Sequence, residues 1–154
     1  MRRITIAVLV LIVGVALFVG LRPMTPARTA DDYRHKAKDT AESVLSSVQT
    51  VRLAARVGSD GDAFGPYVSV VLSESEDAVA KAQGSFDRIQ PPDAWSDRTR
   101  ARLGRLLDRS NDLVSRLRIS ARRGELDRLE AQARPLQPLA HRLEAFIDEP
   151  GPAS

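Results

Sequence analysis

Two histidines, His35 and His141, are the residues of this sequence best suited to bind a metal ion or to transfer protons at neutral pH. Glu144 follows His141 by three residues, which places both side chains on one face of a helix. No Glu-x-x-His pair occurs, so the pattern of carboxylate di-iron bundles is absent. Cysteine is absent too, which excludes disulfides, thiolate metal sites and cysteine nucleophiles. We therefore predict a non-enzymatic protein with no cofactor and no metal.

A glycine-rich segment at 58–66, GSDGDAFGP, begins like a calcium-binding loop because Asp60 and Asp62 stand two residues apart. The similarity ends there, since Phe64 occupies the third ligand position and Val71 replaces the glutamate expected at the twelfth. Glycine at this density is typical of a turn between helices. We interpret the segment as a connecting turn.

A row of arginines is the most ordered polar feature of the sequence. At 100° per residue its members fall within an arc of about 60° on one helix, over a length of roughly 37 Å. The segment at 96–123 that carries them has nine basic and three acidic residues. This row, called the arginine stripe below, consists of Arg98, Arg102, Arg105, Arg109, Arg116 and Arg123.

The stripe suits docking to anionic lipid headgroups, an anionic wall polymer or an acidic partner protein. The alternative is a solvated face partly paired with acidic neighbours. Nucleic acid is not expected, because the chain has 23 basic and 20 acidic residues and three of the basic ones, Arg2, Arg3 and Arg22, flank the apolar N-terminal run. The remainder, 20 against 20, is formally neutral and lacks interleaved aromatics.

Four aromatic residues form a second candidate site. They lie near predicted helix ends, where an aromatic ring more often seals a bundle than binds a ligand. If they converge, they would line a small pocket at one end of the bundle. They are Phe64, Tyr67, Phe86 and Trp95.

Residues 4–21 form an uncharged, strongly apolar run that would span roughly 27 Å as a helix, close to the thickness of a bilayer core. We predict a transmembrane signal-anchor over 1–22 that holds the protein to the lipid bilayer. A cleaved signal peptide and secretion is the alternative, but the run is long and no good cleavage site follows it. Arg2 and Arg3 favour a cytoplasmic N-terminus and an extracytoplasmic C-terminal domain.

The rest of the chain divides into a juxtamembrane linker at 23–30, a helical region at 31–148 and a disordered tail at 149–154. Apolar residues recur at alternating spacings of four and three, which is typical of packed or coiled helices. The pattern predicts helices at about 31–57, 62 or 66 to 89, 93 or 96 to 122, and 125–148. Asp31 or Asp32 is expected to cap the first helix, and Gly58 to end it.

Short connections between these helices favour an antiparallel arrangement. The predicted fold is all-α, an N-terminal transmembrane helix followed by an up-down-up-down four-helix bundle. Pro135 and Pro138 lie inside the fourth segment and should kink or split it, because proline removes a backbone hydrogen bond.

Several short motifs resemble small membrane-anchored helical proteins of high-GC Gram-positive bacteria, a group with no assigned activity. They are Pro66-Tyr67, Ser75-Glu76-Asp77-Ala78, Phe86, Pro91-Pro92 and Arg122-Arg123-Gly124. The resemblance implies an anchored helical domain and no particular chemistry. The general plan is also similar to ligand-sensing helical domains of bacterial receptors.

From these features we expect a single-pass cell-envelope protein that acts as an interaction or scaffold module. An extracytoplasmic ligand-sensing or solute-binding bundle that works through a partner is the alternative. An unknown envelope protein is a candidate partner, and the heptad spacing leaves a homo-oligomer open.

Overall fold

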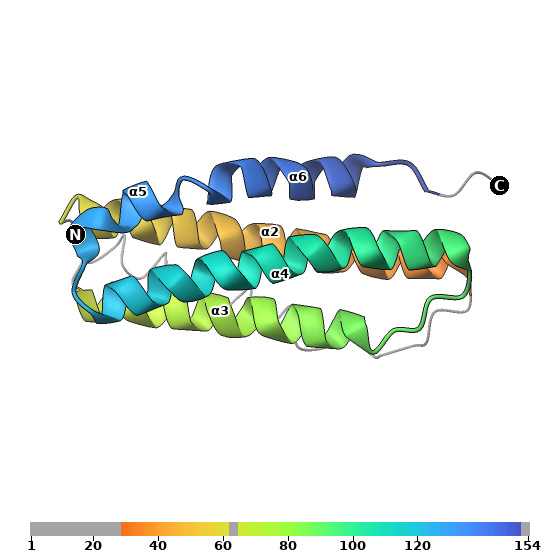
Figure 1. Ribbon diagram of the computed structural model, residues 1–154, viewed down its shortest axis with the longest axis horizontal. Coiled ribbons are helices and arrows are strands. Elements are labelled where there is room, and N and C mark those ends of the chain that lie inside the picture. The colour runs from red at the N-terminus through yellow and green to blue at the C-terminus, as the bar shows by residue number, and fades with distance from the viewer. Residues whose placement is uncertain (1–28, 62–64, 152–154) are drawn as a thin grey trace, which may run out of the picture.

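The computed structural model describes residues 29–61 and 65–151 (Figure 1). Within these ranges it contains no strand, so the predicted all-α class is confirmed. The long helices lie side by side and alternate in direction along the chain (Figure 1). The elements are α2 (Ala30–Ser59), α3 (Gly65–Asp87), α4 (Ala94–Arg122), a 3-10 turn η1 (Leu126–Arg128), α5 (Leu129–Ala133) and α6 (Leu136–Asp148).

No helix in the described ranges combines the length and the apolar character needed to cross a membrane. The predicted anchor at 1–22 and the linker as far as residue 28 lie outside the described residues. Asp62 of the glycine-rich segment and Phe64 of the aromatic set also lie outside them.

Helix α2 begins one residue earlier than expected, and Thr29 caps it. The Thr29 hydroxyl oxygen accepts a hydrogen bond of 3.1 Å from the Asp32 amide. The prediction that Asp31 or Asp32 is the cap is therefore wrong. Both carboxylates instead lie in the first turn, where negative charge stabilises the helix dipole.

The expected end of α2 at Gly58 is also wrong, because Gly58 lies inside the helix and is buried. A methyl group added there would lie 3.3 Å from the Val68 side chain and 3.5 Å from that of Leu129. Glycine at this position lets α3 and α5 approach α2 closely. The chain turns at Gly61, whose φ of 75° is a conformation that favours glycine.

The start of α4 and the break in the last helical segment agree with the sequence. A carboxylate oxygen of Asp93 accepts a hydrogen bond of 2.8 Å from the Ser96 amide. The last segment is split into η1, α5 and α6, with the break before α6 at Pro135. Pro138 lies in the first turn of α6, where a backbone N–H has no helical partner to lose.

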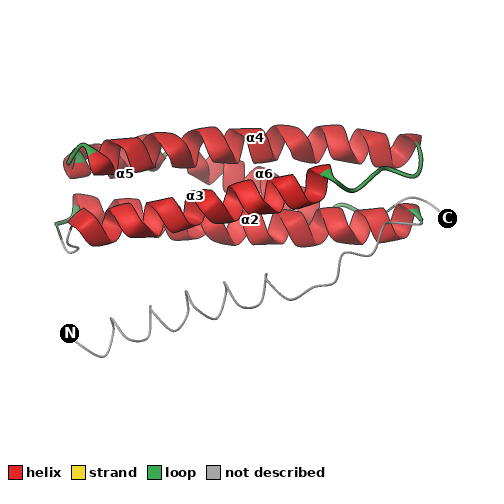
Figure 2. Cartoon of the chain, turned by 90° about the horizontal axis from the view of Figure 1, so that it is seen from below, coloured by secondary structure: helices red, strands yellow, loops and turns green. Residues whose placement is uncertain are grey.

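The core runs along the length of α2, which packs against α3, α4, α5 and α6 (Figures 1 and 2). Its small side chains allow this, because alanine and valine bring neighbouring helices close. Helix α6 packs more extensively on α2 than on α4. The predicted apolar face of α2 is entirely buried: Ala37, Ala41, Val44, Val48, Val51 and Ala55.

Candidate functional site: an arginine-lined seam

Helices α4 and α6 meet along a seam that is less extensive than the junctions of α2 with α3, α4 and α6. Two neighbouring hollows lie along it, with volumes of about 200 and 410 Å³. Arg102 lines both hollows and joins them into one groove. We call the guanidinium-bearing walls of this groove the arginine seam: Arg98, Arg102, Arg105 and Arg109 of α4 and Arg142 of α6.

The structure divides the predicted arginine stripe. Its first four members line the groove, whereas Arg116 and Arg123 line neither hollow. The reason is the length of the neighbouring helix, because α6 has only 13 residues and faces one part of α4. Arg123 caps the C-terminus of α4 and is exposed.

The arginines of the seam differ in their partners. Arg102 forms an ion pair with Glu149. Arg109 lies 3.0 Å from Asp112, which also pairs with Arg116 at 2.9 Å. Arg98, Arg105 and Arg142 form no ion pair with any residue that the structure describes. The five guanidinium groups therefore exceed the carboxylates that neutralise them.

The larger hollow has an apolar floor between its charged walls. Leu106 of α4 and Leu139 and Ala145 of α6 line it together with Arg102, Arg105, Arg109 and Arg142. Leu139 is buried, while Leu106 is only partly covered by the core. Such a groove can pair with anionic groups at its edges and bury an apolar group at its centre.

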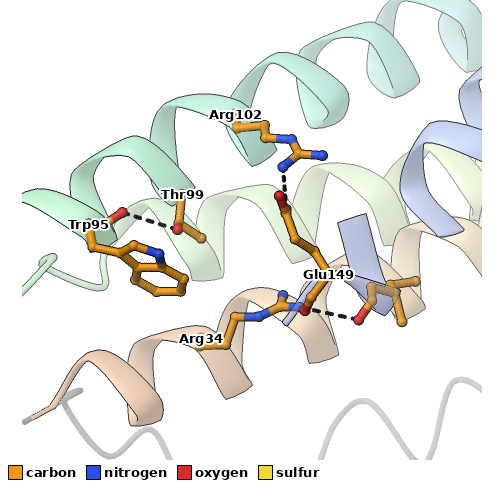
Figure 3. A network of polar contacts seen from close by, with 6 residues as sticks. Arg34, Trp95, Thr99, Arg102 and Glu149 are labelled. Atoms are coloured by element: carbon orange, nitrogen blue, oxygen red, sulfur yellow. Dashed lines mark hydrogen bonds and ion pairs between the residues drawn. The ribbon is translucent and has the colours of Figure 1, made fainter. Parts of the chain in front are cut away.

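One end of the seam is occupied by the C-terminal end of α6 (Figure 3). The Arg34 guanidinium donates hydrogen bonds to the backbone carbonyls of Ile147, at 3.2 Å, and of Glu149. Arg34 and Arg102 both lie against the Phe146 ring, 5.4 and 5.6 Å from its centroid. Glu149 was expected to begin a disordered tail. It is instead held at its backbone by Arg34 and at its carboxylate by Arg102.

The four aromatic residues of the second candidate site do not form one pocket. Tyr67 and Phe86 lie near opposite ends of α3, a separation of about 28 Å along the helix. Phe86 is buried and packs on Tyr33, with ring centroids 5.6 Å apart. Trp95 lies at the start of α4 and lines the smaller hollow beside Arg98. Of the three that the structure describes, Trp95 alone lines the seam.

Two groups close to this end of the bundle have shifted pKa values. Burial raises the pKa of Tyr33 to about 12, and its hydroxyl has no hydrogen-bond partner among the described residues. The hydrogen bond from the Ser96 backbone amide holds the pKa of the Asp93 carboxyl below its ordinary value. Both shifts follow from structural roles, since Tyr33 fills the core and Asp93 caps α4.

Neither histidine lines a hollow of the seam, and each lies near a carboxylate. Nδ1 of His141 is 3.1 Å from Glu144, and Nε2 of His35 is 3.8 Å from Asp39. Across the described part of the chain, no three residues of the kinds that bind metals are grouped to hold an ion.

Sequence reasoning missed the residues that α2 and α6 contribute, namely Arg34, Leu139, Arg142, Ala145, Phe146 and Glu149. One signal was available, because Leu139, Arg142 and Ala145 repeat at intervals of three and share a helical face. Nothing in the sequence showed that this face would lie against the arginine stripe.

Comparison with known proteins found no matching family model, no matching curated protein and no matching solved structure.

Proposed function

We propose that this chain is a membrane-anchored, extracytoplasmic helical domain that acts as a non-enzymatic interaction module and docks an anionic partner in the arginine seam. The observation that carries the proposal is the position of Arg105 and Arg142. These two side chains come from different helices, line the same groove and form no ion pair with a described residue. Long charged side chains gathered without partners around an apolar floor are typical of an interface.

The proposed location rests on the sequence. Residues 4–21 would supply the anchor, and the arginines near the N-terminus would keep that end in the cytoplasm. The seven residues between Arg22 and Ala30 can span at most about 28 Å when fully extended. The end of the bundle with Trp95 and Arg98, near the start of α2, would then face the membrane, and the seam would run away from it (Figures 1 and 3).

The alternative function, a solute sensor, depends on an enclosed cavity that can surround a small molecule. The described core is filled by buried aliphatic and aromatic side chains. The two hollows lie at the edge of this core, along the seam, where Phe146 and Leu139 line them. Surface grooves of this kind favour a macromolecular partner.

Crosslinking in cells tests the proposal. The tagged full-length protein would be crosslinked in its native host and purified from membranes. We expect a reproducible partner that is lost when Arg105→Gln and Arg142→Gln are combined. The matched control is Arg128→Gln with Arg134→Gln, which removes two exposed charges outside the seam. A partner retained equally by both double variants would contradict docking through the seam.

A further inference from the structure

We propose that the arginine seam recognises a carboxylate-bearing peptide segment of a partner protein, and that Glu149 competes with that segment for Arg102. This inference rests on the proposed function and specifies both the partner's chemistry and its control. Glu149 already places a carboxylate in the groove, where Arg102 binds it. The Glu149 carboxylate therefore shows which kind of chemical group the seam can bind.

The geometry of the seam favours a peptide. Arg102, Arg105 and Arg109 follow one another at intervals of three and four residues on α4, so their bases are about 5–6 Å apart. A helical peptide with carboxylates at the same intervals presents them at the same spacing. The apolar floor between the walls then takes one of its apolar side chains.

A flat anionic membrane surface fits the same face less well. Asp112 shares this face with Arg109 and Arg116 and neutralises part of their charge. Glu149 lines the smaller hollow and would approach an anionic surface together with the arginines. A bound peptide can place its carboxylates against the arginines alone and avoid these repulsions.

The position of Glu149 is set by contacts that do not depend on its own side chain. Arg34 of α2 holds the backbone carbonyls of Ile147 and Glu149, and the buried Phe146 ring packs under Arg34 and Arg102. The end of α6 is thus fixed, and the Glu149 carboxylate remains near Arg102. It is half exposed, so a stronger ligand can displace it.

Removing the competitor without moving the backbone isolates its effect. Glu149→Gln keeps the size of the side chain and removes its charge. Asp148→Asn is the matched control, because it makes the same change in charge one residue earlier, at an exposed side chain with no described ion pair. The probe is a short fluorescein-labelled peptide of alternating Glu and Leu pairs, titrated against the full-length protein in nanodiscs of phosphatidylcholine.

We expect Glu149→Gln to increase the affinity for this peptide about two- to fivefold, which is the range of an exposed ion pair. Asp148→Asn should leave the affinity unchanged. Arg105→Gln with Arg142→Gln should lower it about five- to tenfold in either background, and added salt should weaken it. Equal affinity of the wild type, Glu149→Gln and Asp148→Asn proteins would overturn the competition.

The same titration distinguishes the other molecules that could bind in the seam. Glycerol phosphate, the headgroup fragment of an anionic phospholipid, serves as the lipid probe. Binding of glycerol phosphate without binding of the peptide would assign the seam to a lipid headgroup and overturn the peptide assignment. Self-association that disappears in Glu149→Gln would assign it to a second copy of the chain. If only the competition fails while the seam variant still loses its crosslinked partner, the proposed function stands.

Discussion

Helix α4 presents arginines to two neighbours, and the two sides differ in how those charges are used. Toward α3 several polar groups are paired across the junction. Arg118 pairs with Glu76, and the Gln83 amide donates to Asp108 at 2.6 Å and accepts from Asn111. Toward α6, Arg105 and Arg142 lie in the same groove with no carboxylate partner in the described chain.

The difference separates charges that hold the fold from charges that are available for binding. The Arg118–Glu76 pair links α3 to α4 with both side chains only 22% exposed, so it fixes how these helices meet. Arg105 is exposed and links nothing within the described chain. The presence of arginines on a helix face therefore says little about function until the neighbouring helix is known.

The largest expected effect is on stability, and it compares a buried ring beside the seam with a buried ring on the α3 side. Phe146→Ala should destabilise the protein by about 3–5 kcal/mol, because it removes a buried ring. It should also raise the affinity for the peptide, because a released end of α6 no longer holds Glu149 against Arg102. Phe86→Ala removes an equally buried ring at the α3 side and should cost about as much stability while sparing the seam. Urea unfolding followed by circular dichroism, with peptide titration at low urea, measures both. An equal change in peptide affinity in the two variants would break the distinction between the two sides.

A smaller effect compares a paired with an unpaired arginine. Arg118→Ala should destabilise the protein by about 1–2 kcal/mol, because Glu76 is left partly buried without its partner. Arg105→Ala should change stability by less than about 0.5 kcal/mol but reduce peptide binding. The same unfolding and titration measurements apply, and adding Glu76→Gln to Arg118→Ala should recover part of the loss. If Arg105→Ala proved as destabilising as Arg118→Ala, the α6 side would also be structural.

The smallest expected effect concerns Tyr33 of α2, whose ring packs on Phe86 of α3. Its buried hydroxyl has no hydrogen-bond partner among the described residues. In the folded protein the pKa of Tyr33 is about 12, above the ordinary value of 10. The contribution of the neutral phenol to the free energy of unfolding is therefore fully present below pH 10. That contribution is lost as the pH rises from about 10 through 12. Tyr33→Phe should be neutral or stabilising by up to about 1 kcal/mol at pH 7 and should flatten this part of the stability curve. Unfolding at a series of pH values measures it, and an unchanged alkaline decline would show that other groups cause it.

Much of the fold could be predicted because it depends on local patterns. The four-and-three spacing identified the buried face of α2. The start of α4 was expected at Asp93 or Ser96, and Asp93 is the cap. The prolines at 135 and 138 predicted a kink or split, and the break lies at Pro135. Both ends of α2 were misplaced for specific reasons. Thr29, and neither Asp31 nor Asp32, caps the N-terminus of α2. Gly58 lies inside α2, where the side chains of Val68 and Leu129 pack closely against it.

The candidate site was predictable only in part. The sequence by itself determined an all-helical chain, an apolar run at 4–21 and a row of arginines on one helical face, because each depends on spacing along one segment. Only the tertiary structure decided that Arg142 and the floor of Leu139 and Ala145 lie beside that row, and that Glu149 reaches Arg102. The physical reason is that residue spacing sets which side chains share a face of one helix, whereas the packing of that helix on its neighbours decides which charges meet a partner.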